Sequence, residues 1–139
     1  MMNVEELMAA YARAFEAHDA DAAAALWAYP AHVTADLGSE VRLTVVPDQP
    51  TFLPMLHALM EKYRRDGVKR IRTLSLDVKQ LSPRLCQVSV QWGLLGLADL
   101  PLYDFDNTYL VARFEQHWRI VSSIAPNELA RYRAFIGRG

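Results

Sequence analysis

The chain has 139 residues, the length of one compact domain, and 52% hydrophobic and 22% charged residues exclude an intrinsically disordered protein. The formal net charge of −1 gives no general attraction for nucleic acid or an anionic membrane, and the single cysteine, Cys86, excludes an internal disulfide. We therefore expect one domain over residues 1–139, with neither nucleic acid nor membrane as a partner.

Targeting and cofactor signals are missing from the sequence. No apolar stretch approaches the roughly 20 residues that span a bilayer, and the N-terminal Met-Met-Asn-Val-Glu-Glu is acidic where a signal peptide is basic. The histidines lack the close spacing of metal sites, and no glycine-rich nucleotide-binding motif occurs. We expect a cytoplasmic protein that needs no metal or organic cofactor.

The N-terminal region is rich in alanine and is predicted to form two helices. Asn3 and Glu6 fit a capping box at the start of the first. Apolar residues then recur at helical spacing: Val4, Leu7, Met8, Tyr11 and Phe15. Asp19 is a suitable N-cap for a short second helix, which carries Leu26 and Trp27 inward and ends near Pro30.

The centre of the chain is predicted to form a β-rich segment over His32–Val46, with a turn at residues 37–39, and then a third helix. Thr51 is its expected cap and Gly67 its C-terminal stop.

After Gly67 the pattern is typical of strands almost to the end. Strands are expected at Arg70–Gln80, Leu85–Leu94, Phe105–Gln116 and Trp118–Ile124, with a last short helix from about Asn127. Helices followed by long antiparallel strands predict an α+β fold.

The order of these elements resembles the nuclear-transport-factor-2-like superfamily, which includes ketosteroid isomerases and SnoaL-like polyketide cyclases. The residues that carry the resemblance are the segment from Tyr11 to Asp21, the Leu26-Trp27 pair and the closing Trp118-Arg119-Ile120-Val121. The resemblance implies a cone-shaped, strongly bent mixed or antiparallel sheet wrapped around three helices, with a deep apolar pocket. A shared fold does not imply a shared reaction.

Compared with ketosteroid isomerases, the chain keeps one of three catalytic positions. Tyr11 falls where that family has its oxyanion-donating tyrosine. The general-base aspartate falls at Ala35, one residue from Asp36, and the second acid falls at Leu110. Steroid isomerisation is therefore not expected.

Two carboxylates are candidates for acid–base work beside Tyr11. If Leu110 points into the pocket, as the resemblance implies, strand alternation turns Asp106 inward as well, where apolar walls disfavour its charged form. Asp36 reaches the pocket only through a bulge. The alternatives are a solvated acidic strand end for Asp106, a turn residue for Asp36 and a structural core role for Tyr11.

Apolar side chains are expected to form the walls of the pocket and to suit a small apolar or planar ligand: Phe15, Trp27, Trp92, Leu110 and Phe114. A filled core satisfies the same pattern. Two function classes stay open. One is a small-molecule-binding protein acting as a cofactor-independent acid–base enzyme of the isomerase, dehydratase or cyclase type. The other is a non-catalytic ligand-binding or dimeric structural module.

A homodimer is expected through the outer face of the sheet. On the predicted strands Tyr109 and Val111 alternate opposite Leu110 and Ala112, so both sheet faces have an apolar character.

Overall fold

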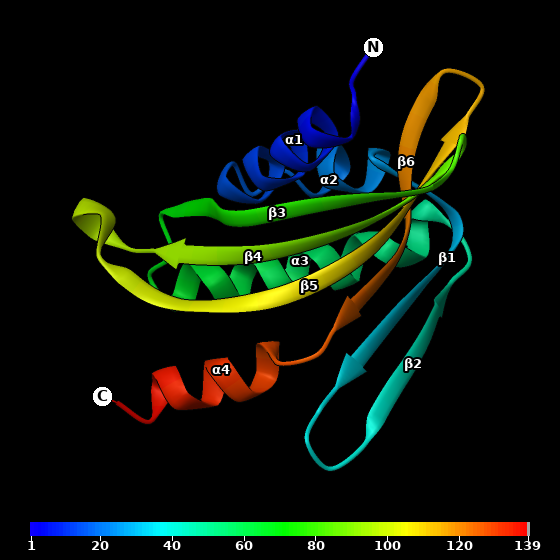
Figure 1. The fold of residues 1–139 in the computed structure, drawn as a ribbon. Helices are drawn as coiled ribbons and strands as arrows, with labels where there is room; N and C mark the ends of the chain where they lie inside the picture. Colours follow the sequence, from blue (N-terminus) through cyan, green and yellow to red (C-terminus); the bar gives the residue numbers. More distant parts are fainter. Residues whose placement is uncertain (139) are drawn as a thin grey trace.

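The computed structural model describes residues 1–138, which form an α+β fold of four α-helices and one six-stranded sheet (Figure 1). The helices are α1 (Val4–Glu16), α2 (Ala20–Ala25), α3 (Gln49–Arg65) and α4 (Glu128–Ile136), with a short 3₁₀ turn, η1 (Leu97–Asp99). The strands are β1 (Trp27–Asp36), β2 (Val41–Val46), β3 (Arg70–Ser82), β4 (Leu85–Leu95), β5 (Pro101–Phe114) and β6 (His117–Ala125).

The sheet is mixed, open and strongly bent (Figure 1). Its strand order is β2-β1-β6-β5-β4-β3, in which β1 and β6 run parallel and every other neighbouring pair runs antiparallel. The edges β2 and β3 are not paired with each other, so the sheet does not close into a barrel. This architecture confirms the predicted fold class.

The first two helices begin where capping chemistry predicts. The Glu6 backbone N–H donates to Asn3 Oδ1 at 2.8 Å, and the Asn3 N–H donates to Glu6 Oε1 at 3.1 Å, which completes the capping box. Asp19 accepts from the Ala22 N–H at 3.0 Å at the start of α2. Local side-chain chemistry thus sets both helix starts.

Two helix boundaries differ from the sequence prediction, and β5 begins at Pro101 instead of Phe105. The cap of α3 is Asp48, which accepts from the Thr51 N–H at 2.8 Å, so Thr51 is the third residue of the helix rather than its cap. Trp27 is the first residue of β1 and not part of α2. Pro30 lies inside β1, where the pairing with β6 is irregular and the missing N–H is tolerated. Gly67 does end α3, with a φ of +85°.

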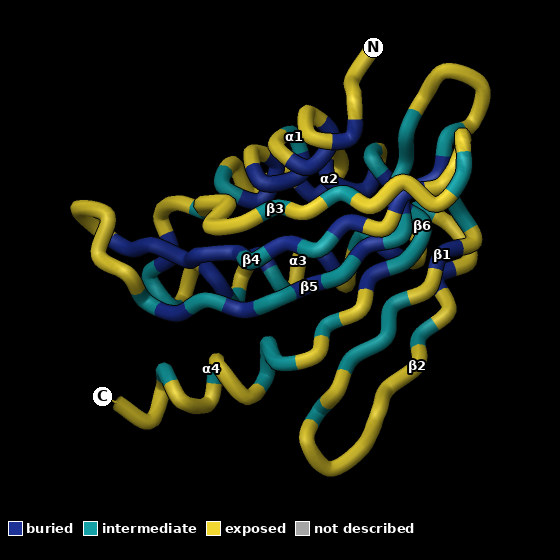
Figure 2. The backbone as a smooth tube through the Cα atoms, viewed as in Figure 1, coloured by how far each residue is buried: buried dark blue, intermediate teal, exposed yellow. Residues whose placement is uncertain are grey.

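The core lies between the helices and the inner face of the central strands (Figure 2). Along β4 every second residue is buried up to Trp92, as the alternation predicts. α1 buries its apolar stripe, including Leu7, Met8 and Tyr11, against this face. α4 buries no residue completely and packs against β5 at the margin of the core.

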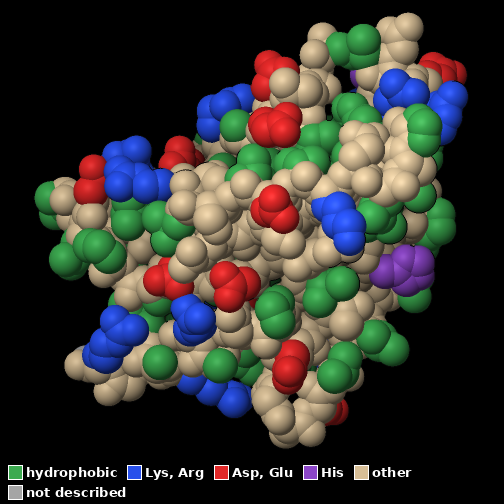
Figure 3. All heavy atoms as spheres, in the orientation of Figure 1, with side chains coloured by type: hydrophobic (Ala, Val, Ile, Leu, Met, Phe, Trp, Pro, Cys, Tyr) green, Lys and Arg blue, Asp and Glu red, His purple; other side chains and the backbone are tan. Residues whose placement is uncertain are grey.

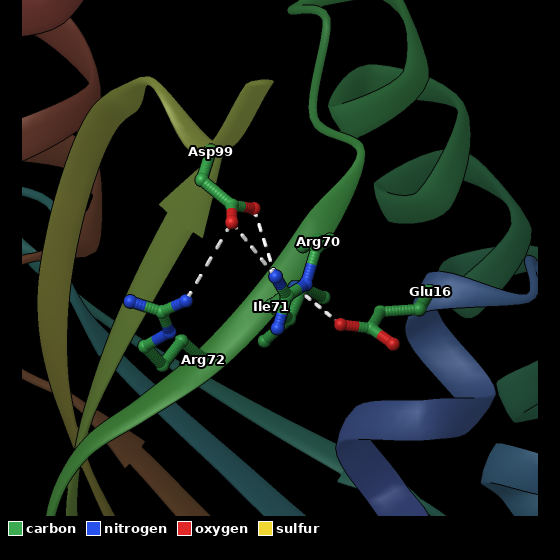
Figure 4. A network of polar contacts seen from close by, with 5 residues as sticks. All are labelled: Glu16, Arg70, Ile71, Arg72 and Asp99. Carbon is green, nitrogen blue, oxygen red and sulfur yellow. Dashed lines mark hydrogen bonds and ion pairs between the residues drawn. The ribbon is translucent and has the colours of Figure 1, made fainter. Parts of the chain in front are cut away.

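A polar network fixes the end of α1 and the η1 turn to the edge strand β3 (Figure 4). Glu16 Oε1 accepts from the Ile71 backbone N–H at 2.7 Å. Asp99 accepts twice from Arg70 Nη1, each time at 2.9 Å, and lies 3.9 Å from Arg72 Nη2. The Glu16 contact pairs one backbone N–H of this edge strand, and the exposed ion pairs join the η1 turn to it.

The surface carries interspersed charges of both signs on the face that Figure 3 shows, as the near-zero net charge predicts. Among residues 1–138, no helix is long and apolar enough to cross a membrane.

Candidate functional site

A cavity of about 220 Å³ lies between α1, α3 and the inner face of the sheet. Its lining is aromatic and aliphatic over most of its area, with a few polar groups. The polar lining residues are Tyr11, Tyr63, Asn107, Tyr109, Ser123 and Glu128, together with the indole groups of Trp27 and Trp92. Apart from the three tyrosines, Glu128 is the only ionisable residue in the described lining.

Four of the predicted site residues line this cavity: Tyr11, Phe15, Trp27 and Trp92. The ring centroids of Tyr11 and Phe15 are 5.1 Å apart, and the Trp27 ring meets that of Phe52 edge-on at 4.9 Å. Edge-to-face pairs of this kind fix the walls in place. The wall predictions for these residues agree with the geometry, whereas their roles toward a ligand stay predictions.

The predicted inward direction of Asp106 and Leu110 is wrong. Strand pairing sets Phe105 opposite Trp92 and Asn107 opposite Val90, so the odd-numbered residues of β5 face the cavity. Asp106 and Leu110 consequently face the other side of the sheet. The comparison with ketosteroid isomerases, which assumed no gaps, assigned the wrong set of alternating residues to the inward face of β5. A shift of one residue exchanges the two faces of a strand.

The same shift overturns two further expectations. Phe114, predicted as a wall, is 49% exposed at the end of β5 and lies outside the cavity lining. Tyr109 and Val111, predicted on the outer face, are buried inside.

Asp36 is a turn residue, as its alternative interpretation held. It is exposed at the end of β1, and its Oδ1 accepts from the Gly38 backbone N–H at 2.8 Å. Because it lies outside the cavity lining, it cannot act there with Tyr11.

The carboxyl group of the site comes from Glu128, which the sequence interpretation missed. Part of the residue is accessible, but its carboxyl group is enclosed, and Tyr63 donates a hydrogen bond to Oε2 at 2.5 Å. Burial raises the pKa of Glu128, while the Tyr63 hydrogen bond and the positive charge of Lys62 partly oppose that rise. A carboxyl group with a raised pKa can gain and lose a proton closer to neutral pH.

Asp106 is hydrogen-bonded to Asn127, the residue that precedes Glu128. The Asp106 backbone N–H donates to Asn127 Oδ1 at 2.9 Å, and Asn127 Nδ2 donates back to Asp106 Oδ2 at 2.8 Å. This reciprocal pair fixes the residue immediately before Glu128 to the outer side of β5. The predicted catalytic aspartate is therefore a structural clamp at the entry to α4.

The aromatic walls themselves carry hydrogen-bond donors. Trp92 Nε1 donates to the Tyr109 hydroxyl at 2.9 Å, which leaves the Tyr109 proton available to another acceptor. The rings of Tyr11 and Tyr109 are 6.1 Å apart. Burial raises the pKa of both tyrosines, so both hydroxyls keep their protons at neutral pH.

Trp27 supplies a further donor. Its Nε1 is buried and has no hydrogen-bond partner within the described residues, although it lies close enough to the Tyr11 hydroxyl to lower the pKa of Tyr11 slightly. A buried N–H without a good acceptor is costly, and an acceptor atom in the cavity would satisfy it.

Nothing in the linear sequence marks Glu128 as part of a pocket. The only signal is its place at the first turn of a short helix that follows a buried strand, and acidic residues are favoured at that place for reasons of helix stability alone.

Comparison with solved structures shows the same fold at low sequence identity. A protein with a cystatin-like fold from Nostoc punctiforme has a TM-score of 0.71 at 11% identity, covering 88% of this chain and 86% of its own. Aln2 from a Streptomyces species has a TM-score of 0.70 at 16% identity, covering 94% and 92%. An NTF2-like protein from Novosphingobium aromaticivorans has a TM-score of 0.68 at 15% identity, covering 96% and 86%.

A comparison with curated proteins gave no significant match. The sequence matches the family described as NTF2-like protein (DUF6841) over residues 2–128, a range that includes the cavity-lining residues from Tyr11 to Glu128 but only the first residue of α4. The chain therefore belongs to the NTF2-like family, as its resemblance predicted.

Proposed function

We propose that the protein binds a small, uncharged, planar carbonyl compound and moves a proton on it, as a cofactor-independent enzyme of the isomerase, dehydratase or cyclase type. The observation that carries this proposal is Glu128, a carboxyl group with a raised pKa in an otherwise apolar cavity, together with protonated tyrosines in the same lining. Apolar walls favour an uncharged ligand, because a second buried charge would have to be desolvated.

The proposed chemistry needs a base and a set of hydrogen-bond donors. Glu128 takes a proton from the carbon next to the carbonyl, and the C–H electron pair moves into an enolate whose oxygen accepts hydrogen bonds. Tyr11 and Tyr109 are the donors for that oxygen, and Trp27 Nε1 is a third. The proton then returns to another carbon in an isomerisation, or a neighbouring leaving group departs in an elimination.

The second candidate is a carrier that binds the same ligand without chemistry. The small cavity and its rigid aromatic walls support a carrier as well as they support an enzyme, since neither feature requires a proton transfer. Binding and proton transfer are therefore tested separately.

Binding is tested with 2-tetralone, an uncharged bicyclic ketone, through the fluorescence of Trp27 and Trp92. Ala125→Phe fills part of the cavity and is expected to weaken binding at least about tenfold. Ala58→Phe, on the exposed side of α3, is the matched control and should leave binding unchanged. Equal affinity in both variants would place the ligand elsewhere.

We also propose that the protein forms a homodimer through the outer face of the sheet, as first predicted, but at the edge strand β2 rather than at Tyr109 and Val111. Val41, Leu43 and Val45 of the edge strand β2 are 61%, 76% and 61% exposed. These three residues form an apolar row along the edge strand, and the Thr34 side chain on β1 separates Leu43 from Ile124, which is also exposed. An exposed apolar row on an edge strand favours a self-complementary contact with a second copy.

Leu43→Lys is expected to convert this dimer to a monomer, because a lysine in a symmetric contact meets its copy or loses its hydration. Sedimentation velocity at micromolar concentration measures the change, with Leu97→Lys in the exposed η1 turn as the control. A wild-type protein that sediments as a monomer would contradict the proposal.

A further inference from the structure

Lys62 of α3 is a half-buried cation held by aromatic rings from three elements. Its Nζ lies 3.7 Å from the ring centroid of Tyr132 on α4, 5.2 Å from that of Tyr63 and 5.7 Å from that of Tyr103 on β5. The same ammonium donates to the Tyr103 hydroxyl at 3.2 Å. At 3.7 Å from the centroid the ammonium is attracted to the Tyr132 ring, and more strongly where water is displaced, whereas it meets Tyr103 at the hydroxyl.

The rest of α4 is attached weakly. The helix has no completely buried residue, and its entry is fixed by the clamp between Asn127 and Asp106 described above. Farther along, Arg131 Nη1 donates to Asp104 Oδ1 at 2.6 Å in an exposed ion pair, a type of contact that adds little stability. The Tyr103 ring also packs on Phe135, with centroids 5.0 Å apart. The cation–π contact between Lys62 and Tyr132 thus adds a charged link between α3 and α4, one turn beyond the hydrogen bond from Tyr63 to Glu128.

Electrostatics connect this link to the cavity. Burial lowers the pKa of Lys62, and the negative charge of Glu128 partly opposes that shift, while the Lys62 charge partly opposes the burial that raises the pKa of Glu128. The titratable and charged groups that face Lys62 are Tyr63, Arg65 and Asp66 of α3, Tyr103 of β5, and Glu128 and Tyr132 of α4. Those that act on Glu128 or are acted on by it are Lys62, Tyr63, Tyr11, Tyr103 and Tyr109.

We propose that Lys62 is the positioning residue of the site: it attaches α4 to α3 through Tyr132 and so holds the Glu128 carboxyl group at the cavity wall. This inference rests on the proposed function of Glu128, but the contact between Lys62 and Tyr132 is a property of the fold. Lys62 lies outside the cavity lining, so it acts through Glu128 and not on the ligand.

The test is Lys62→Met, which keeps most of the side-chain length and removes the charge. Amide hydrogen exchange over residues 129–136 is expected to become at least about tenfold faster, because the helix loses its charged link to α3. The ionisation midpoint of Glu128, followed by ¹³C NMR of its carboxyl carbon, is expected to move to higher pH. Lys79→Met, at an exposed lysine of β3, is the matched control and should change neither measurement.

Two further variants separate charge from packing. Lys62→Arg keeps a cation that stacks on aromatic rings and is expected to restore both measurements. Tyr132→Leu removes the ring but not the charge, so it should speed exchange in α4. These variants also decide the question if Lys62→Met folds poorly.

The proposal is overturned if Lys62→Met matches Lys79→Met in both measurements, or if Lys62→Arg behaves like Lys62→Met. Failure of the proposed function has a different signature. In that case the Lys62 variants loosen α4 as expected, while replacement of Glu128 leaves proton exchange in 2-tetralone unchanged.

Discussion

Replacing Glu128 by glutamine is expected to slow hydrogen–deuterium exchange at the α-carbons of 2-tetralone by about 10²–10⁴-fold, the usual contribution of a positioned general base. Glutamine keeps the shape of the side chain and can still accept the hydrogen bond from the Tyr63 hydroxyl. It cannot accept a proton from carbon. The ¹H NMR signal of the exchanging protons in deuterated buffer measures the rate directly.

The control for this variant is Glu40→Gln, which removes the same charge from an exposed turn and should leave the exchange rate unchanged. Binding of 2-tetralone should persist in Glu128→Gln, because the aromatic walls are intact. An unchanged exchange rate would leave only the carrier function. A loss of binding together with exchange would mean that Glu128 holds the ligand rather than its proton.

The stability of the wild-type protein is expected to fall as the pH rises from about 4.5 toward neutrality, and Glu128→Gln is expected to remove that fall. The pKa of Glu128 is raised by burial above its ordinary value of 4.5. Between the unfolded and the folded pKa, the folded state binds more protons than the unfolded state, so the free energy of unfolding decreases with pH. Each unit of pKa difference corresponds to about 1.4 kcal/mol at most.

Other groups with shifted pKa values affect the stability outside this pH range. Asp48 and Glu61 have lowered pKa values, caused mainly by hydrogen bonds from Thr51 and Arg64, so their effects appear below about pH 4.5 and have the opposite sign. Tyr29, whose pKa is raised by burial to about 12, acts only in alkali.

Urea unfolding at a series of pH values measures the effect. The glutamine variant should be more stable than the wild type at neutral pH and of similar stability below the unfolded pKa of Glu128. Parallel curves for the two proteins would show that the Glu128 carboxyl group is not desolvated in the folded state. A gain in stability with a loss of proton transfer is the usual signature of a functional buried charge.

The helices, most strand positions and the fold class could be predicted from the sequence because they depend on neighbours in the chain. A capping box joins Asn3 to Glu6 across one turn, and Gly67 supplies the positive φ that ends α3. Four of the cavity residues could also be predicted from the sequence. Tyr11 and Phe15 follow the buried stripe of α1, and Trp92 belongs to the buried face of β4.

Which residue supplies the carboxylate of the site depends on the tertiary structure alone. Alternation along β5 defines two sets of residues but not which set faces inward, and only the pairing of Phe105 with Trp92 settles it. That pairing sends Asp106 outward, where it is hydrogen-bonded to Asn127, and the cavity carboxyl group comes instead from Glu128, the next residue of the chain. The sequence by itself therefore determined the elements and the aromatic walls, whose causes are local or periodic. The identity of the acid–base group depended on the register between strands and on a helix that returns from a distant part of the chain, and no short-range pattern encodes either.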